Sequence, residues 1–212
     1  MCIRDRYKII DNFLKKDHFN YLCKIQLKKT NPNDLSIYHN QVYKNGKTHT
    51  ECISKEILLD LDKTYKNTLM NLLQEMYPEK ATFYEYSDFH IIETGSNYSY
   101  PIHNDDPNKL LSGVIYLAPE NNRGTIIYDD KYGKIPKEIE WKPNRGMFFS
   151  RKENKTWHSY EGDKKNNRKT LVYNLMTTDS KKICEIEKIN YYRQKTKEFL
   201  NPYIYRFFKK LI

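Results

Sequence analysis

The chain has 212 residues, of which 38% are hydrophobic and 30% charged, and its formal net charge is +10. This length suits one domain with a real hydrophobic core. No apolar run approaches the length of a membrane span, and from the charged residues 1–6 we expect no secretory signal. Residues 1–6 also fit poorly with the sequence that follows, which leaves open whether they belong to the native protein.

The charges are unevenly distributed. Residues 83–130 contain two basic and eight acidic residues, a net of −6, whereas residues 181–212 contain nine basic and three acidic residues, a net of +6. Such a basic tail suits an anionic membrane, a sugar-phosphate polymer or a nucleic acid. An AT-rich genome is the alternative explanation of the excess basic charge, because it enriches Lys, Asn, Ile and Tyr without any binding role. The four cysteines show no paired spacing, so we expect free thiols and a cytoplasmic protein; they are Cys2, Cys23, Cys52 and Cys184.

Two helices are predicted in the first third of the chain. Asp17 is placed to cap the first helix, and Ser54 the second, which Pro78 ends. The apolar face of the first would be formed by Phe19, Leu22, Cys23 and Leu27. The inward positions of the second would be Leu58, Leu61, Tyr65, Leu72 and Met76. Residues 31–50 are expected to form a loop in which His39 and His49 are solvated rather than metal ligands.

Short β-favouring runs follow, bounded by Gly, Pro, Asn or charged residues. They are residues 113–118, 124–128, 142–149 and 157–159. After Met176 the periodicity is helical, and the predicted face consists of Ile183, Ile186, Ile189 and Tyr192. The dipeptide Asn201-Pro202 is expected to break this helical run.

The last ten residues combine aromatic and basic side chains. One helical side would carry Tyr203, Ile204, Phe207, Phe208 and Leu211. Our expectation is that this side packs on the β-rich core. The alternative is a helix that lies on an anionic membrane surface, because basic residues beside bulky apolar ones suit such an interface.

One constellation points to a chemistry: His103 and Asp105, followed by His158 and then by Arg168. On an extended segment, residues two apart share a face, so His103 and Asp105 would point the same way, and Asp106 the opposite way. Two imidazoles and one carboxylate form the facial triad of non-haem Fe(II) oxygenases. A guanidinium ten residues past the second histidine could then hold the far carboxylate of 2-oxoglutarate.

The stretch from about residue 88 to residue 176 resembles the catalytic core of the Fe(II)/2-oxoglutarate dioxygenases, especially the prolyl 4-hydroxylase-like group with its phage and marine bacterial members. The similarity rests on several ordered motifs. They are residues 100–105 for the first-ligand strand, 108–117 for the next strand, Gly124-Thr125 for the end of a Gly-Gly-Thr turn, 143–149 for the approach to the second histidine, and 168–171 for the cosubstrate-anchoring strand.

This resemblance implies a mostly β fold with flanking helices around a double-stranded β-helix (jelly-roll) core. It implies one domain over residues 1–212, with supporting helices and a loop in 1–81, the core in 82–178, and a basic helical segment in 179–212. His103, Asp105 and His158 would bind Fe(II). Arg168 would anchor 2-oxoglutarate, with a further hydrogen bond from Thr125 or Tyr116. O2 would be the oxidant, and ascorbate a possible stimulant.

The chain departs from the prolyl hydroxylase pattern at two places. Ile91 and Ile92 stand before Gly95 where an Arg-Tyr pair is common, and Arg168 stands where many prolyl hydroxylases have lysine. Arginine offers a two-pronged match to a carboxylate, so the second change is chemically coherent, although it weakens the case for a peptidyl proline substrate. Asp105 argues for hydroxylation, because the related halogenases have a small residue there.

The predicted reaction is therefore hydroxylation of an unactivated C–H bond in a small molecule, a sugar or a protein side chain, with succinate and CO2 as coproducts. Two alternatives remain. A nucleic-acid demethylase would share the chemistry, but the core shows no aromatic-basic RNA motif, so we expect no stable nucleic-acid partner. A cupin-like metal-binding barrel could use the same ligands, yet it gives Arg168 no task. The basic tail is expected to make at most weak contact with an anionic membrane or a polysaccharide.

Overall fold

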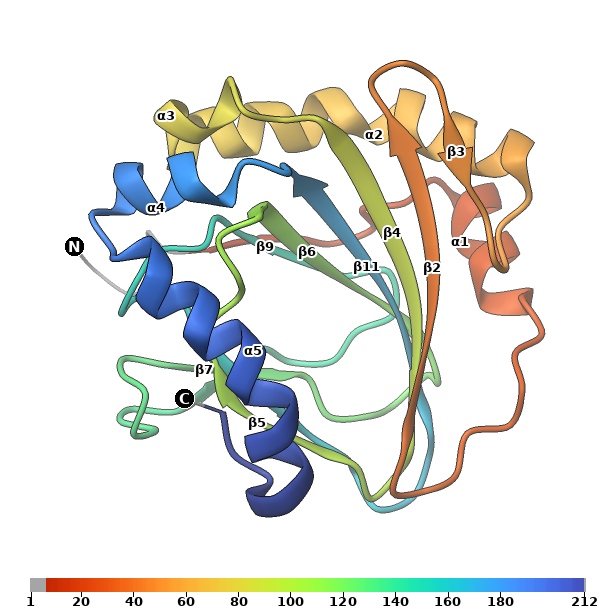
Figure 1. Ribbon diagram of the computed structural model, residues 1–212. Helices are drawn as coiled ribbons and strands as arrows, with labels where there is room; N and C mark the ends of the chain where they lie inside the picture. The colour runs from red at the N-terminus through yellow and green to blue at the C-terminus, as the bar shows by residue number, and fades with distance from the viewer. Residues whose placement is uncertain (1–6, 212) are drawn as a thin grey trace.

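The computed structural model describes residues 7–211 and consists of two antiparallel sheets with flanking helices (Figure 1). The seven-stranded major sheet has the order β1-β9-β6-β11-β4-β2-β3, and the four-stranded minor sheet the order β5-β10-β7-β8. The strands of the major sheet are β1 (Lys8–Ile10), β2 (Leu35–Tyr43), β3 (Thr48–His49), β4 (Tyr86–Thr94), β6 (Lys109–Ala118), β9 (Gly146–Phe149) and β11 (Arg168–Met176). Those of the minor sheet are β5 (Ser99–His103), β7 (Thr125–Tyr128), β8 (Lys137–Glu138) and β10 (Trp157–Glu161). The predicted mostly β fold with flanking helices is confirmed.

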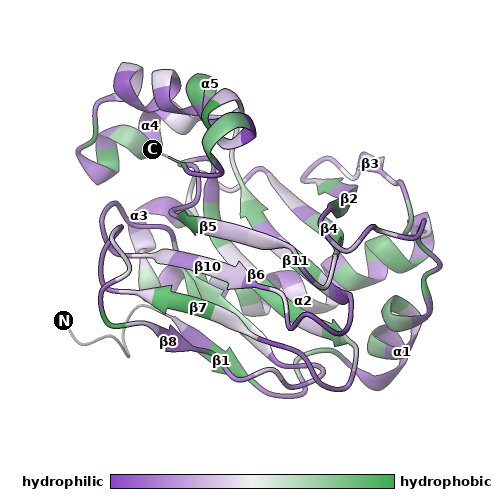
Figure 2. Cartoon of the chain, turned by 90° about the horizontal axis from the view of Figure 1, so that it is seen from below, coloured by the Kyte–Doolittle hydropathy of each residue, from purple (hydrophilic) through white to green (hydrophobic). Residues whose placement is uncertain are grey.

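The helices within residues 7–211 are α1 (Lys16–Lys24), α2 (Lys55–Met76), α3 (Pro78–Ala81), α4 (Ser180–Glu187) and α5 (Tyr191–Phe208). Helices α1 and α2 pack on one face of the major sheet, and the minor sheet lies in front of the other face (Figure 2). No helix within residues 7–211 is long and apolar enough to cross a membrane. Cys23, Cys52 and Cys184 are free, as expected, and Cys2 lies outside the described residues, like the rest of residues 1–6.

The alternation of side chains along β11 divides the major sheet into two chemically different faces. Leu171, Tyr173 and Leu175 are fully buried in the apolar core under the helices. The residues between them point to the opposite face, and Arg168, Thr170 and Asn174 there are polar and also buried. The helix face supplies the hydrophobic core, and the polar face is available for a site.

Helix α1 differs from the prediction at both ends, whereas α2 largely agrees with it. The N-cap of α1 is Lys15, which makes no side-chain capping bond, so the proposed cap at Asp17 is wrong; Asp17 lies in the first turn, where its charge suits the helix dipole. Leu27 lies beyond the end of α1. Ser54 does cap α2, since its side chain accepts a hydrogen bond from the Ile57 amide. Pro78 follows the end of α2, as predicted, but it also begins α3.

The expected loop at residues 31–50 contains β2 and β3. Strand β2 pairs along its whole length with β4, from Leu35 opposite Thr94 to Tyr43 opposite Tyr86. Its alternation escaped the sequence pattern because both faces carry polar residues: Asn40 is buried on one face, and His39 and Gln41 lie on the other. His39 is thus a strand residue, and His49 belongs to β3.

The C-terminal segment forms two helices instead of one interrupted run. Asp179 caps α4 and Asn190 caps α5, each by accepting a hydrogen bond from a backbone amide three residues on. Lys188, in the left-handed conformation, ends α4. The predicted break at Asn201-Pro202 is wrong, because α5 continues through Pro202 to Phe208. A proline usually ends a helix since it lacks an N–H donor, and the α5 backbone tolerates that loss here.

The predicted packing side of the tail is also wrong. Tyr203, Phe207 and Phe208 are 56%, 72% and 71% exposed, whereas Tyr205, on another side of α5, donates or accepts a hydrogen bond of 2.8 Å with the Tyr98 hydroxyl. Helix α5 therefore docks through Tyr205 and leaves most of the apolar side in solvent.

A buried ionic cluster joins α3, α4 and the chain after β9. Glu187 is 1% exposed; one carboxylate oxygen accepts from Lys80 at 2.6 Å, and the other accepts from Arg151. Burial lowers the pKa of Lys80 to about 8, although Glu187 opposes the shift. Arg151 also donates from Nε to the Asp105 carbonyl at 2.7 Å. The cluster thus connects the C-terminal helices to the segment that carries Asp105.

Glu187→Gln should destabilise the fold by about 3–5 kcal/mol, because it leaves the buried Lys80 without its anion and leaves Arg151 paired with Glu153 alone. Glu185→Gln, on the same helix, is the matched control: its ion pair with Lys182 is about half exposed, so the loss should stay below about 0.5 kcal/mol. Chemical denaturation of the three proteins measures both values. Equal stability of the two variants would show that the cluster contributes nothing.

Candidate metal centre and cosubstrate pocket

The two sheets bring His103, Asp105 and His158 together on the polar side of the major sheet. His103 ends β5, His158 lies in the neighbouring β10, and the two are register partners. Asp105 follows β5 by two residues. One ligand atom from each of the three side chains lies within 4.8 Å of the other two. Asp106 is exposed and outside this group, so the choice of Asp105 agrees with the geometry.

Backbone carbonyls orient both imidazoles. Nδ1 of His103 is 3.0 Å from the Pro101 carbonyl, and Nδ1 of His158 is 2.9 Å from the Thr156 carbonyl. Each Nδ1 donates to its carbonyl, which leaves each Nε2 lone pair free as a ligand. Burial and the neighbouring His158 lower the pKa of His103 to about 3, and burial also lowers the pKa of His158. Both rings are therefore neutral, the form that binds a metal.

Asp105 is held as a carboxylate. Burial alone would raise its pKa, but Lys109 and the two histidines together lower it well below its ordinary value. Lys109 donates to one oxygen at 2.8 Å, and Ser112 to the other at 2.5 Å. Because each carboxylate oxygen has two acceptor positions, these bonds leave room for a metal. The donor set fits the two-histidine, one-carboxylate arrangement of non-haem Fe(II) sites.

Arg168 begins β11 and is 6% exposed, with Nε and one terminal nitrogen that have no hydrogen-bond partner in the described part of the chain. Three aromatic rings surround its guanidinium carbon, whose distance to the ring centroid is 3.8 Å for Tyr160 and 5.6 Å for both Tyr116 and Trp141. Burial lowers the pKa of this arginine. A buried cation with unused donors is costly, and a ligand carboxylate would satisfy it.

Thr125 and Tyr116 lie together beside this guanidinium. The Thr125 amide donates to the Tyr116 hydroxyl at 2.9 Å, and both residues are buried. The preceding Gly124 is required by space, because a Cβ there would lie 1.6 Å from the Ile139 carbonyl oxygen. The structure thus gathers every predicted site residue in one region, and Tyr116 has a hydroxyl proton that remains available.

A cavity of about 520 Å³ contains both the triad and the anchor. His103, Asp105, His158, Arg168 and Thr125 all line it. One wall comes from α5 and the residues after it, through Lys197, Glu198, Asn201, Pro202, Tyr205 and Leu211. Of the residues before β4, Leu35 and Ile37 of β2 line the cavity.

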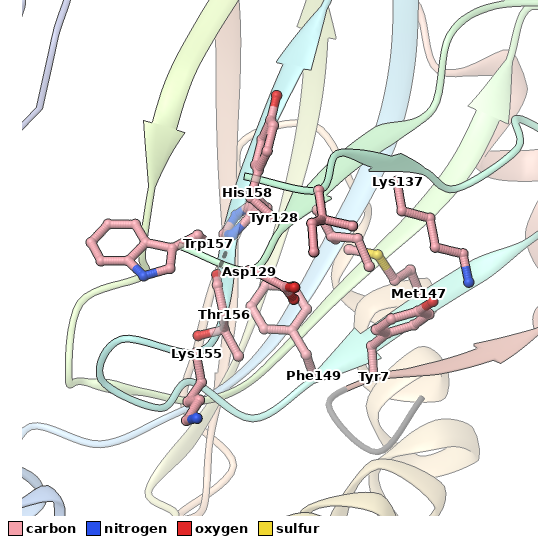
Figure 3. Close-up of a pocket in the computed structure, with 12 residues that line it drawn as sticks. Tyr7, Tyr128, Asp129, Lys137, Met147, Phe149, Lys155, Thr156, Trp157 and His158 are labelled. Atoms are coloured by element: carbon pink, nitrogen blue, oxygen red, sulfur yellow. Dashed lines mark hydrogen bonds between the residues drawn. The ribbon is translucent and has the colours of Figure 1, made fainter. Parts of the chain in front are cut away.

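A second pocket adjoins His158 and has a volume of about 30 Å³ (Figure 3). It is lined by residues that include Met147 and Phe149 of β9, together with Tyr7 and Trp157. This volume is far below that of ligand sites, which occupy about 300–1,000 Å³. The pocket is thus no alternative site for a cosubstrate.

Sequence reasoning missed several residues of the site. Lys109 and Ser112 donate hydrogen bonds to Asp105. They lie four and seven residues after it, and no sequence motif marks these positions. Tyr160, which stacks on Arg168, shares a strand face with His158 two residues earlier, so alternation along β10 could have suggested it. Trp141 and Tyr205 come from distant parts of the chain that only the fold brings near.

No family model and no curated protein sequence matches this chain. Solved structures do. An oxidoreductase of the 2OG-Fe(II) oxygenase family from Burkholderia pseudomallei aligns with a TM-score of 0.54 and 14% identity, over 80% of this chain and 84% of the other. A prolyl-4-hydroxylase from Pseudomonas putida aligns with a TM-score of 0.52 and 13% identity, over 82% and 96%. A dioxygenase for auxin oxidation from Arabidopsis thaliana, solved with 2-oxoglutarate, aligns with a TM-score of 0.55 and 13% identity, over 81% and 83%.

The fold is that of the Fe(II)/2-oxoglutarate oxygenases. At 11–14% identity such likeness speaks for the double-stranded β-helix itself, and the resemblance noted from the sequence motifs is confirmed at that level. The His-x-Asp and His positions stand within this fold as a facial-triad candidate.

If Arg168 binds a carboxylate of 2-oxoglutarate, as the sequence predicts, Arg168→Ala should weaken 2-oxoglutarate binding by about 2–5 kcal/mol, which is roughly 30-fold to several thousand-fold in Kd. Arg168→Lys should recover only part of the affinity, since it lacks the two-pronged geometry. Anaerobic titration calorimetry of the metal-loaded protein measures both.

Arg123→Ala is the control for this prediction, because Arg123 is partly exposed and pairs with Glu138 and Glu161. Other basic residues near the site are already engaged: Lys169 donates to the Cys23 and Ile25 carbonyls, and Arg145 pairs with Asp11. An unchanged Kd in Arg168→Ala would remove Arg168 from the cosubstrate site.

Proposed function

We propose that this protein is an Fe(II)- and 2-oxoglutarate-dependent dioxygenase that hydroxylates an unactivated C–H bond. The observation that carries the proposal is the pair of unpartnered guanidinium nitrogens of Arg168, Nε and one terminal nitrogen, in the same cavity as the neutral histidine pair and Asp105. A metal triad alone would suit many barrels. A buried cation with open donors beside it calls for a small dianion, and 2-oxoglutarate has one carboxylate for each of the two features.

Each residue has a separate task in this proposal. Nε2 of His103 and of His158, with one oxygen of Asp105, would hold Fe(II), which supplies O2 activation coupled to conversion of 2-oxoglutarate to succinate and CO2. Arg168 binds the distal carboxylate, and the Tyr116 hydroxyl or the Thr125 side chain donates a further hydrogen bond to it. Lys109 and Ser112 keep Asp105 ionised and oriented. The aromatic rings around Arg168 exclude water and so strengthen its electrostatic grip.

The carboxylate of Asp105 favours hydroxylation over halogenation, because the related halogenases have a small residue at this position. The cavity volume of about 520 Å³ suits a small molecule, a sugar or a protein side chain as the prime substrate. The charged side chains that line the cavity include Asp106 and Glu198 as well as Lys109 and Lys197, so its wall is not the basic track that a nucleic acid needs. A cupin-like barrel would leave the buried Arg168 without a role.

The exposed side of α5 supports a proposal about partners. Its C-terminal part carries large side chains that are more than half exposed, namely Phe199, Tyr203, Phe207 and Phe208, and basic residues stand beside them at Arg206, Lys209 and Lys210. Aromatic residues with flanking cations suit the interface of an anionic membrane. We propose weak, salt-sensitive contact of this side, here called the tail face, with anionic lipid.

His103→Ala and His158→Ala should each abolish formation of succinate from 2-oxoglutarate, because each removes one of three protein ligands. Both variants should keep the circular dichroism spectrum of the parent, since the histidines face a cavity and not the apolar core. The assay follows succinate in the presence of Fe(II), O2 and ascorbate, with His49→Ala as a control at an exposed histidine. Parental succinate formation by either variant would refute the metal assignment.

The double variant Phe207→Ser/Phe208→Ser should lose binding to vesicles that contain acidic phospholipid and keep its melting temperature, because both rings are exposed. Binding of the unaltered protein should weaken as salt rises. Co-sedimentation with vesicles measures this, and Tyr132→Ser, at an 82% exposed aromatic residue between β7 and β8, is the control. A lowered melting temperature with unchanged binding would mean that the tail face is structural.

A further inference from the structure

A second group of metal-ligand side chains lies on the polar face of the major sheet. It consists of His39 on β2 with Asp88 and His90 on β4, and one donor atom of each lies within 4.8 Å of the other two. His39 and His90 are register partners across the two strands, and Asp88 precedes His90 by two residues, so all three point to the same face. His90 lines the catalytic cavity, at the side opposite β6 in the strand order.

The donor atoms of these three side chains point toward one common position, as the ligands of a metal ion do. Nε2 of His90 lies 3.0 Å from Nδ1 of His39 and 2.6 Å from Oδ2 of Asp88. That nitrogen carries at most one hydrogen, so it cannot make a full hydrogen bond to both neighbours. Ligand atoms around a tetrahedral zinc ion lie about 3.3 Å apart, given metal–nitrogen bonds of about 2.0–2.1 Å. A cation could take lone pairs from all three atoms after small movements.

The surroundings orient the group and add negative charge. Gln41 donates to the second oxygen of Asp88 at 3.3 Å, which leaves Oδ2 directed at His90. Glu51 accepts a hydrogen bond from the His39 amide at 2.6 Å. Ligands of protein-bound metals are commonly held by such outer hydrogen bonds.

An independent observation concerns Asn174, the partner of Asp88 on the other side of β4. Asn174 is fully buried and shares the polar face with Asp88, so the two Cβ atoms lie about 5 Å apart. Neither its amide nitrogen nor its amide oxygen has a hydrogen-bond partner within residues 7–211. An unsatisfied buried amide is costly, and a hydrated ion beside Asp88 would give it partners.

We propose that His39, Asp88 and His90 form a second metal site, which binds a divalent transition-metal ion of the zinc class at the edge of the catalytic cavity. Two imidazoles and one carboxylate are the ligand types that Zn(II) and Co(II) accept, and the exposed position of His39 leaves coordination positions for water or for a ligand group in the cavity. Since no residue is shared with the triad, this site does not depend on the proposed hydroxylase activity.

The test removes the first site in order to see the second. In the His103→Ala/His158→Ala background, the full-length protein should bind one Zn(II) per chain, as measured by calorimetry and by metal analysis after dialysis. Co(II) should bind at the same stoichiometry and give visible absorption bands typical of a site with fewer than six ligands. The unaltered protein should bind two equivalents of Zn(II).

Addition of His90→Ala or of the isosteric Asp88→Asn to that background should weaken Zn(II) binding at least tenfold, while His49→Ala, at the exposed histidine on β3, should leave it unchanged. Circular dichroism checks that each variant is folded. If His90→Ala does not fold, the isosteric Asp88→Asn provides the test. Absence of Zn(II) binding in the triad-deficient background, or binding that persists in Asp88→Asn, would overturn the second site. Succinate formation by the unaltered protein would still report separately on the triad.

Discussion

The pairing of β11 with β4 on one side and β6 on the other is the constraint on which the rest of the structure depends. It places an apolar layer against α1 and α2, and a polar layer that also contains Val114 and Val172 against the minor sheet. The polar layer includes Arg168, Asn174 and Asp88, groups that are costly to bury without partners. Burial of the apolar face under α1 and α2 offsets the free-energy cost of burying these polar groups. These two helices therefore make the polar site possible.

The ionic cluster around Glu187 extends this dependence to the C-terminal helices. Arg151 binds Glu187 of α4 and also donates to the carbonyl of Asp105, so the backbone next to a candidate metal ligand is fixed from outside the jelly roll. Helix α5 then places Tyr205 against Tyr98 and Tyr100, and Tyr100 packs edge-on against His103. The C-terminal segment is therefore both a wall of the cavity and a support of the metal centre.

The sequence allowed the triad, the anchor and the β-rich class to be predicted because short motifs carry them: His-x-Asp, the second histidine and Arg168 are recognisable without long-range information. It did not reveal β2, because the polar residues His39 and Gln41 on the cavity side hide the usual apolar alternation. It also misplaced the tail. Spacing alone assigned Tyr203, Phe207 and Phe208 to one side of a helix, but which side docks depends on Tyr205 meeting Tyr98, a contact between residues far apart in the chain.

The register of β11 also determines where the groups of the cavity lie relative to one another. Arg168 and Asn174 lie six residues apart on β11, which is about 20 Å along the strand. Ser112 of β6 is the register partner of Asn174 and donates to Asp105, so the carboxylate ligand lies towards the Asn174 end of β11. A cosubstrate anchored at Arg168 therefore reaches the metal from one end of β11. In the proposed reaction, a prime substrate would approach from the remaining side, between α5 and the edge formed by β2 and β4, where Tyr205 and His90 line the wall. In the proposed dioxygenase, side chains of α5 and of β2, rather than the residues around the triad, would select the substrate.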